Sequence, residues 1–289
     1  MASTDQFVLS LADAGGAPLH VVGGKAAGFR PLAAARLPFP DGIVVSAAAH
    51  RRARESGWAA GSPLPDAVAE AVEAALPALA EQPLAVRSSA VAEDGGTASF
   101  AGQFATLLGV RADAVPDAIA ACWASAEDGR AHAYRLGDGG DRTMAVIVQA
   151  LVDADVSGVI VTADPLTGDE GTLVVNASFG LGEAVVSGIV TPDEYRLARA
   201  DGAVVDALVA DKEVALRRGP DGTVEEELPP GRREAPALGT AELRALWRGA
   251  LAAEAALGRP ADLEFAIQDG RLLWLQCRPL TALPAKEAR

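Results

Sequence analysis

Short apolar runs rich in β-branched residues alternate along this chain with alanine-rich stretches of helical spacing. The strand-like runs include 42–45 and 143–152, and the helical stretches include 66–80 and 240–257. Because strands repeat every two residues and helices about every 3.6, this alternation predicts a mixed α/β (α+β) fold. Half of the 289 residues are hydrophobic, which leaves room for one large domain or two small ones.

Acidic residues outnumber basic ones. Lys and Arg total 25 against 39 Asp and Glu, for a net charge of −14. Nucleic acids and anionic membranes attract extended basic surfaces, so we expect neither as a partner. Any phosphate that this chain binds must therefore be held by a local group of residues.

The ends of the chain and its cysteines indicate a compartment. The N-terminal MASTDQFVLSLADAGG lacks the basic and apolar regions of a signal peptide, and no uncharged run of about 18 residues follows it. Cys122 and Cys277 lie far apart in apolar runs, which predicts small core residues rather than a disulfide or a metal site. We expect a soluble, cytoplasmic protein.

Four local patterns lead to structural expectations. Gly23–Gly24 predict a turn that opens a helix, and Ser46 predicts the start of another. The buried runs 143–152 and 157–165 predict two strands linked as a hairpin. The charged, Pro- and Gly-rich stretch 206–238 predicts an irregular excursion rather than a core element.

Two cations near the N-terminus are candidates for anion binding. In Gly23–Gly24–Lys25, backbone N–H groups and an ammonium could approach a phosphate, although the same pattern also fits a turn followed by a surface lysine. Arg87 ends an apolar strand, and its guanidinium suits a phosphate or a carboxylate. A structural ion pair is the alternative for this arginine.

A loop of small residues at 95–103 has few side chains that could pack. Its backbone amides at Ser99, Ala101 and Gly102 could fold over a polyphosphate, as glycine-rich lids do in nucleotide enzymes. The alternative is an ordinary flexible hairpin tip. The pattern therefore indicates a phosphate lid only in combination with other phosphate-binding residues.

The last two strand-like runs, within 261–281, predict a hairpin that carries polar side chains. Asp262 and Glu264 share one face of the first strand, and Gln276 and Arg278 share one face of the second. Carboxylate and amide oxygens are ligands that Mg²⁺ prefers, and a neighbouring arginine could neutralise a phosphate. This combination favours a nucleotide–magnesium site.

The turn of this hairpin decides whether the two polar faces coincide. A two-residue loop at Asp269–Gly270 would place Glu264 opposite Leu275. A three-residue loop from Gln268 to Gly270 would instead place Asp262 opposite Gln276. Only the longer loop, or a bulge that compensates for the shorter one, assembles a single site.

Seven segments in the right order resemble the ATP-binding domain of the phosphoenolpyruvate synthase, pyruvate phosphate dikinase and rifampin phosphotransferase family. The segments are GGKAAG, LAVRSSAVAED, ASFAGQ, MAVIVQ, SGVIVTADPLTG, NASFGLGEAVVSGIVTPDEY and DLEFAIQDGRLLWLQCRP. The resemblance implies an ATP-grasp fold whose lobes clamp ATP between sheets. We expect an N-terminal α/β lobe at 1–85, a central lobe with the lid at 86–205 and a C-terminal lobe at 206–289.

The resemblance also implies roles for individual residues. Lys25, Arg87 and Arg278 would act on the phosphates during catalysis, and the loop with Ser99, Ala101 and Gly102 would cover them. The other implied ATP or Mg²⁺ contacts are Gln149 and Leu151 at the adenine, Glu183 near the nucleotide, and Asp262, Glu264 and Gln276 at the metal. Lys212 corresponds less distinctly to a family lysine. The first motif departs from the usual GGKGANL, which puts the packing of its helix in doubt.

The resemblance implies an acceptor outside this sequence. Full-length members pass the group from ATP to a histidine on a swivelling domain, and none of His20, His50 or His132 lies in such a segment. For these histidines we expect surface or helix-packing roles. We therefore expect a phosphotransferase that acts with a separate phosphohistidine-domain protein or directly on a small molecule. The alternative is a non-catalytic, ATP-binding regulatory subunit.

Overall fold

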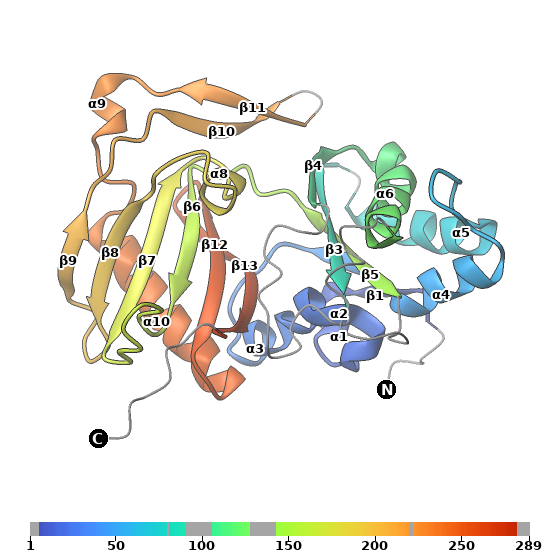
Figure 1. The fold of residues 1–289 in the computed structure, drawn as a ribbon, viewed down its shortest axis with the longest axis horizontal. Coiled ribbons are helices and arrows are strands. Elements are labelled where there is room, and N and C mark those ends of the chain that lie inside the picture. Colours follow the sequence, from blue (N-terminus) through green and yellow to red (C-terminus); the bar gives the residue numbers. More distant parts are fainter. Residues whose placement is uncertain (1–5, 80, 91–105, 128–142, 220–221, 282–289) are drawn as a thin grey trace. The chain divides into compact units, whose positions relative to one another are not determined.

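A computed structural model describes residues 6–79, 81–90, 106–127, 143–219 and 222–281. The chain forms two compact units, which comprise 1–30, 40–151 and 220–222 in the first, and 31–39, 152–219 and 223–289 in the second. Each unit has its own antiparallel sheet with helices packed on it (Figure 1). The mixed α/β class is thus confirmed, while the three expected lobes stay a prediction.

The sheet of the first unit has five strands in the order β1-β2-β5-β3-β4. Their bounds are β1 (Val8–Ser10), β2 (Gly42–Val45), β5 (Met144–Ala150), β3 (Leu84–Ala90) and β4 (Thr106–Val110). Every residue of β5 is buried, because this apolar run lies in the middle of the sheet with helices against it. The short helices around the sheet are α1 (Leu11–Ala14), α2 (Leu19–Ala27), α4 (Ala47–Glu55), α5 (Asp66–Ala75), η1 (Leu76–Ala78), η2 (Ala112–Ala114) and α6 (Val115–Glu127).

The core of the first unit includes two of the residues singled out above. Cys122 is fully buried on α6, as its apolar run predicted. His50 is also fully buried on α4, where its ring stacks on Trp123 with centroids 4.7 Å apart. The Nδ1 atom of His50 accepts a hydrogen bond from the Met144 N–H at 3.0 Å. The helix-packing role expected for His50 is therefore confirmed, whereas His132 lies outside the described residues.

The turn expected at Gly23–Gly24 is present as a kink at Gly23, but it does not open the helix, because α2 already begins at Leu19. Gly23 has φ +74°, and a Cβ there would lie 2.1 Å from the Ser89 carbonyl oxygen. Only glycine fits this contact. The Ser89 hydroxyl joins the two helical pieces, because it donates to the Val22 carbonyl at 2.8 Å and accepts from the Ala26 N–H at 3.1 Å. Likewise Ser46 begins α4 and accepts from the Ala49 N–H, as expected.

The sheet of the second unit has six antiparallel strands in the order β13-β12-β6-β7-β8-β9. Their bounds are β13 (Arg271–Pro279), β12 (Ala261–Gln268), β6 (Val156–Val161), β7 (Thr172–Phe179), β8 (Asp193–Ala198) and β9 (Val204–Leu208). The predicted helix 240–257 is confirmed as α10 (Thr240–Leu257), which packs on β12, β13 and β6 (Figure 1). The remaining elements are α3 (Phe29–Ala34), α8 (Glu183–Val186), α9 (Pro230–Arg233), β10 (Val214–Gly219) and β11 (Gly222–Glu227). None of the helices in the described part of the chain combines the length and apolarity needed to cross a bilayer.

The expected hairpin between β5 and β6 is wrong, because the two strands belong to different sheets. Strand β5 pairs with β2 and β3, whereas β6 pairs with β12 and β7. The chain passes from the first unit to the second at Leu151–Val152. The connecting residues bond to other partners, with the Leu151 N–H on the Pro83 carbonyl and the Asp155 N–H on the Ile267 carbonyl. Each apolar run therefore finds two neighbours in its own sheet.

The irregular excursion expected at 206–238 is also wrong, because this stretch contains regular structure. It includes the end of β9, the β10–β11 pair and α9. Charged side chains are compatible with these strands because β9 and most of β11 are exposed. Some residues are nevertheless buried, among them Ala215 on β10.

Strand β9 is the outer edge of the six-stranded sheet. All five of its residues are exposed, with Val205 and Leu208 at 60% and 66%. The register against β8 shifts, since Arg196 pairs with Asp206 but Leu197 pairs with Val204. Val205 therefore has no partner residue on β8, which is a β-bulge.

Candidate functional site

In the first unit, the predicted residues lie on the face of the sheet that packs against α2. Arg87 pairs with Ile147, and Ala85 pairs with Gln149. Because cross-strand partners share a face and alternate residues do too, Arg87 and Gln149 lie on the same face. Ser89 lies on this face as well and contacts α2 through its hydroxyl.

Lys25 joins this face from α2. Its Nζ donates a hydrogen bond to the Ser88 carbonyl at 3.0 Å, near the end of β3. The residue follows the break at Gly23 directly, so the close approach of Gly23 to β3 determines where the ammonium lies. The structure thus brings Lys25, Arg87 and Gln149 to one face of the sheet, as an anion site requires.

The segment expected at the adenine begins at the end of β5. The Gln149 side chain is 2% exposed, and its Nε2 lies 3.4 Å from the Pro40 carbonyl oxygen. The next two backbone N–H groups are already engaged, with Ala150 donating to Asp41 and Leu151 donating to Pro83, both at 2.9 Å. A base bound here would have to use other atoms of this segment. The roles of Gln149 and Leu151 stay predictions.

In the second unit, the turn between β12 and β13 has two residues. Gln268 pairs with Arg271, and the intervening Asp269 and Gly270 both have positive φ, at 51° and 73°. Positive φ at both positions is typical of a tight hairpin turn that matches the twist of its strands. Of the two loops considered, the shorter one is present.

A bulge then restores the register that a shared site requires. Phe265 pairs with Trp274, but Glu264 pairs with Gln276, so the register shifts by one residue at Leu275. Beyond the bulge, Asp262 pairs with Arg278. Asp262, Glu264, Gln276 and Arg278 therefore lie on one face of the hairpin. The geometric expectation is confirmed through its bulge alternative.

Asp262 and Arg278 form an ion pair on this face. The Asp262 carboxylate accepts from Nε and one terminal nitrogen of Arg278 at 2.9 and 2.8 Å. Burial raises the pKa of Asp262, against the opposing effect of the Arg278 guanidinium, and the nearby Glu264 raises it further. Asp262 thus acts as the counter-ion of Arg278.

The remaining oxygens on the hairpin face suit a hard cation that is shared with a ligand. Glu264 pairs with Gln276 across the hairpin, and Gln276 is only 4% exposed. Among the described residues, no group of three or more His, Cys, Asp or Glu could form a metal cage. Mg²⁺ is usually bound by one or two carboxylates together with substrate phosphates. This donor set fits that mode of binding.

Several further predicted residues have distinct surroundings. Glu183 is the first residue of α8, which follows Gly182 in the loop after β7. Ser99, Ala101 and Gly102 lie outside the described residues. Cys277 is buried between the two polar residues of β13, and burial raises the pKa of its thiol to about 12. A neutral thiol in this position is a packing residue, as its apolar run predicted.

Lys212 is a fully buried cation with structural partners. Its Nζ pairs with the Asp193 carboxylate and donates to the Ala210 carbonyl at 2.9 Å. Asp193 also accepts from the Tyr195 hydroxyl at 3.0 Å and from the Ala237 N–H at 2.7 Å. This network joins β8 to the segment before α10. Asp193 was not singled out from the sequence, because it lies 19 positions from Lys212 and no local spacing connects the two residues.

The register of the sheet adds one polar residue that the sequence analysis did not single out. Glu264 pairs with Val159 on β6, which in turn pairs with Asn176 on β7. Asn176 therefore lies on the same face as Glu264, two strands away. Its signal was a lone amide in an otherwise buried apolar strand.

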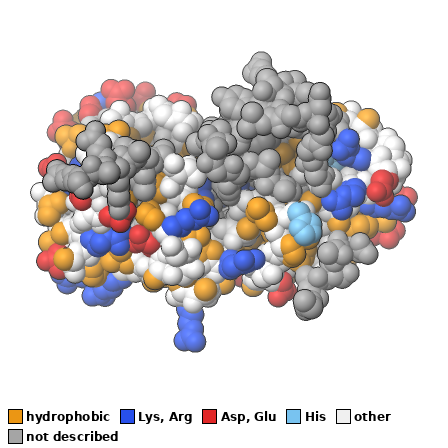
Figure 2. All heavy atoms as spheres, turned by 60° about the horizontal axis from the view of Figure 1, so that its bottom comes forward, with side chains coloured by type: hydrophobic (Ala, Val, Ile, Leu, Met, Phe, Trp, Pro, Cys, Tyr) orange, Lys and Arg blue, Asp and Glu red, His pale blue; other side chains and the backbone are white. Residues whose placement is uncertain are grey.

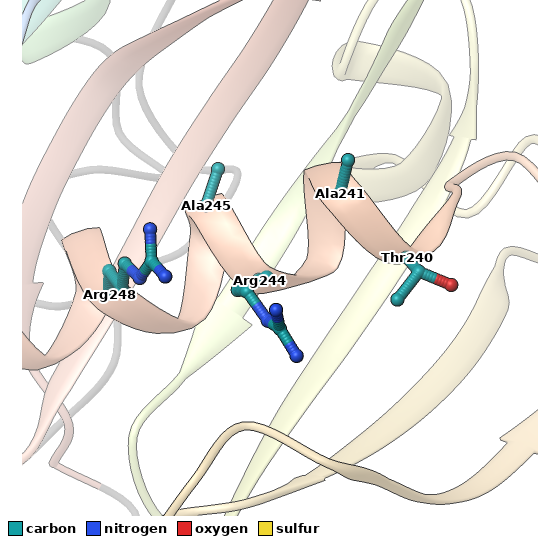
Figure 3. A pocket seen from close by; sticks show the side chains of 5 residues that line it. All are labelled: Thr240, Ala241, Arg244, Ala245 and Arg248. Atoms are coloured by element: carbon teal, nitrogen blue, oxygen red, sulfur yellow. The ribbon is translucent and has the colours of Figure 1, made fainter.

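Two surface hollows lined by described residues lie away from the predicted site residues. One, of about 540 Å³, is lined by Thr240, Ala241, Arg244, Ala245 and Arg248 on the outer side of α10 (Figure 3). The other, of about 480 Å³, is lined by residues of β1, β2 and α5 and the two residues before β1. On the face shown in Figure 2, Lys and Arg are scattered among hydrophobic and neutral side chains. The described side chains that are visible on that face form no broad basic patch.

Comparison with known proteins identifies the family. A family profile described as pyruvate phosphate dikinase, AMP/ATP-binding domain, matches residues 56–289. The prodigiosin synthesizing transferase PigC of Serratia marcescens is 38% identical over 91% of this chain and 32% of its own length. A probable phosphoenolpyruvate synthase of Methanothermobacter thermautotrophicus is 42% identical over 69% of this chain and 30% of its own length. The rifampicin phosphotransferase of Bacillus subtilis is 39% identical over 72% of this chain and 24% of its own length.

These relatives are much longer, since the chain spans about a third or less of each of them. Among solved structures, D-alanine–D-alanine ligase of Bacillus anthracis covers 91% of this chain and 58% of its own, with 9% identity and a TM-score of 0.38. A likeness at this level carries no argument. The ATP-grasp fold stays an expectation from the resemblance, whereas the mixed α/β architecture is seen in the structure itself. The chain belongs to the family of pyruvate phosphate dikinase AMP/ATP-binding domains.

Proposed function

We propose that this chain binds Mg-ATP and transfers a phosphoryl or pyrophosphoryl group from it. The observation that carries the proposal is the bulged register of β12 and β13, which aligns Glu264 with Gln276 and Asp262 with Arg278. The family membership supports a nucleotide as the ligand. The names of two relatives, a phosphotransferase and a phosphoenolpyruvate synthase, support group transfer as the reaction class.

Each unit has its own candidates for phosphate contacts in this proposal. In the first unit they are Lys25 and Arg87, which lie at one face of its sheet, and in the second unit it is Arg278, which is paired with Asp262. Their positive charge stabilises the negative charge that spreads over the transferred group in the transition state. Positioning of the two reactants supplies most of the remaining acceleration. No covalent nucleophile from this chain is required.

Glu264 and Gln276 would hold Mg²⁺, with phosphate oxygens of ATP completing the coordination. When bound, the metal supplies charge that offsets the phosphate oxygens. Asp262 would act mainly by holding Arg278 in place through the ion pair at 2.8 Å. Because a charged guanidinium with a fixed partner loses less freedom on binding, this pairing prepares Arg278 for a phosphate.

The acceptor in this proposal is a phosphohistidine-domain protein or a small molecule. The buried, stacked ring of His50 argues against this residue as a carrier. Because the relatives are about three times longer or more, the remaining functions would reside in the additional length that they carry. In this proposal, the part of the reaction that this chain performs ends when the group has been delivered from ATP.

The test is calorimetric titration of Mg-ATP into the protein and into Glu264→Gln. This change keeps the shape of the side chain but removes the charge that binds the metal. We expect affinity to fall about 10- to 100-fold, the range for losing one charged contact. The matched control is Glu225→Gln, the same change at an exposed position of β11, which should leave affinity unchanged. Equal affinity in both variants would contradict the metal site.

Transfer itself is tested with ATP labelled at the β or the γ phosphate. The protein is incubated with candidate acceptors, and the label is located by mass spectrometry. Label on an acceptor is expected, and its position tells phosphoryl from pyrophosphoryl transfer. Tight Mg-ATP binding without transfer to any histidine-domain protein or small molecule tested would instead favour a regulatory subunit.

A further inference from the structure

The residues of β13 that face the core side of the sheet are not evenly spaced. Trp274 and Cys277 are both 1% exposed and pair with Phe265 and Leu263, which are fully buried. These two positions are three residues apart, whereas in a regular strand every second residue lies on the same face. The register shift between Phe265–Trp274 and Glu264–Gln276 makes the difference. The bulge therefore lets the strand bury Trp274 and still present Gln276 on the opposite face.

Trp274 is held from several sides. On α10, a Cβ added to Gly249 would lie 2.3 Å from Cζ2 of the indole, so the ring occupies the space that the missing side chain leaves. The backbone N–H of Trp274 donates to the Pro38 carbonyl at 2.9 Å. Its cross-strand partner Phe265 fixes the third side. Trp274 is one of the largest fully buried side chains of the protein.

The position of the Trp274 indole beside Gly249 determines where the bulge begins. Suppose that the register of the pairs nearest the turn, such as Phe265–Trp274, continued along the hairpin without a bulge. Glu264 would then pair with Leu275, and Gln276 would pair with Leu263 on the core face against α10. Burying the amide and then Arg278 on that apolar face would be costly. The alternative of keeping Gln276 on the polar face without a bulge would expel Trp274 from the space beside Gly249. The bulge at Leu275 is the arrangement that avoids both costs.

We propose that Trp274, seated against Gly249, is a positioning residue that aligns Glu264 with Gln276 for Mg-ATP. The inference rests on the proposed function and deepens it, since it identifies what sets the geometry of the metal-binding pair. Trp274 acts from the opposite side of the sheet, through the register of β12 and β13. A displacement of the indole shifts the bulge, and the two oxygen donors then no longer face one cation.

The experiment compares Gly249→Ala, Trp274→Phe and the double variant. The new methyl of Gly249→Ala collides with the indole, so we expect Mg-ATP affinity to fall about tenfold or more, while ATP affinity in the presence of EDTA stays unchanged. The smaller phenyl ring of Trp274→Phe makes room for the methyl. The double variant should therefore recover most of the Mg²⁺ dependence. Gly231→Ala is the control, because a Cβ at Gly231 meets no atom within 4 Å.

A merely structural role for Trp274 predicts a different outcome. Gly249→Ala would then lower the melting temperature while Mg-ATP affinity stayed at the wild-type value, and that result would overturn the proposal. If Gly249→Ala does not fold, Trp274→Leu replaces it, since this change empties the space beside Gly249 without a collision. It should weaken the Mg²⁺-dependent part of ATP affinity, and an unchanged value would likewise overturn the proposal.

Nuclear magnetic resonance separates this inference from the proposed function. Contacts between backbone protons of Glu264 and Gln276 report the register without any nucleotide. We expect these contacts in the wild type, their loss in Gly249→Ala and their return in the double variant. That pattern in a protein that fails to bind Mg-ATP would uphold the positioning and reject the function. Contacts that persist in Gly249→Ala would reject the positioning.

Discussion

The two polar faces that carry the predicted site residues are organised by different means. In the first unit, Lys25 lies where it does because Gly23 lets α2 approach the backbone of Ser89. In the second unit, Glu264 and Gln276 face each other because a bulge adjusts the register of a hairpin. One face depends on a single close backbone contact, and the other depends on a pairing pattern that extends over two strands.

This difference has a consequence for how each face tolerates change. A backbone contact without a side chain has no room to adjust, so its disruption should affect the whole unit. A register is supported by many cross-strand pairs, so a local change there should alter binding more than folding. Substitutions at the first face should therefore mainly lower the free energy of unfolding, and substitutions at the second face should mainly lower the affinity for the ligand.

The largest expected effect is that of Gly23→Ala. The methyl would lie 2.1 Å from the Ser89 carbonyl oxygen at a φ of +74°, and steric overlap plus backbone strain should cost roughly 3 to 5 kcal/mol of unfolding free energy. Gly57→Ala is the control, since Gly57 has φ +85° but no atom within 4 Å of a Cβ. It should cost only about 1 to 2 kcal/mol. Denaturant unfolding measures both, and equal costs would show that the contact with Ser89 does not matter.

The next effect separates the two faces by their dependence on metal. Lys25→Met should weaken ATP binding about 10- to 100-fold with or without Mg²⁺, because it removes a phosphate counter-charge. Glu264→Gln should weaken binding only when Mg²⁺ is present. Titrations in Mg²⁺ and in EDTA give the four affinities. If Lys25→Met weakened ATP binding only in the presence of Mg²⁺, the proposal that Lys25 binds phosphate while Glu264 binds the metal would be rejected.

A third prediction concerns stability within the second unit, at the base of the loop after β6. The Arg196 guanidinium lowers the pKa of Asp164 to about 2, and the Leu166 and Thr167 N–H groups assist. A lowered carboxyl pKa stabilises the fold above the unfolded value of 3.8, and this is lost as pH falls through about 2. Asp164→Asn should thus lose about 2 kcal/mol at neutral pH. The difference in unfolding free energy between wild type and Asp164→Asn should narrow between pH 4 and 2, as measured by urea unfolding. A difference that stays constant over this range would contradict the ion pair as its source.

The smallest expected effect belongs to Asp262→Asn, where the sign is reversed. Burial raises the pKa of Asp262 above the ordinary value of 3.8 for an aspartate. Its charged form therefore costs stability at neutral pH, and this cost is relieved as pH falls through the raised pKa. The variant avoids this cost but leaves Arg278 without its partner, so the net change at pH 7 should stay within about 1 kcal/mol. Wild type should gain on the variant as the pH is lowered towards 4. The opposite trend in a pH series of melting curves would reject the burial effect.

Sequence reasoning succeeded where local spacing decides the structure. The non-helical turn at Gly23, the start of α4 after Ser46 and the helix 240–257 depend on residues within a few positions of one another, and all three are present, although the turn interrupts α2 instead of opening it. The hairpin alternatives were also limited in advance by the period of two. The choice between them was not, because it depends on where the indole of Trp274 fits against Gly249, and these residues are 25 positions apart in the printed sequence.

The errors share one physical cause, which is that partners of a strand are not written in its own sequence. Two adjacent apolar runs predict a hairpin, yet β5 and β6 each pair with strands distant in sequence. In the same way, Asn176 belongs to the polar face only through the order β12-β6-β7. The ligands of Lys25, Arg87 and Glu264 stay predictions because side-chain chemistry limits the kind of ligand but does not identify it.

The bulge on β9 bears on how this protein behaves at high concentration. An open sheet edge with side chains such as Leu208, 66% exposed, offers unpaired backbone groups to a strand of another molecule. The unpaired Val205 interrupts the regular spacing of those groups, and the neighbouring Asp206 adds a charge that disfavours stacking. Strand-to-strand aggregation is therefore resisted at the point of the molecule most exposed to it, with no covering element over that edge among the described residues.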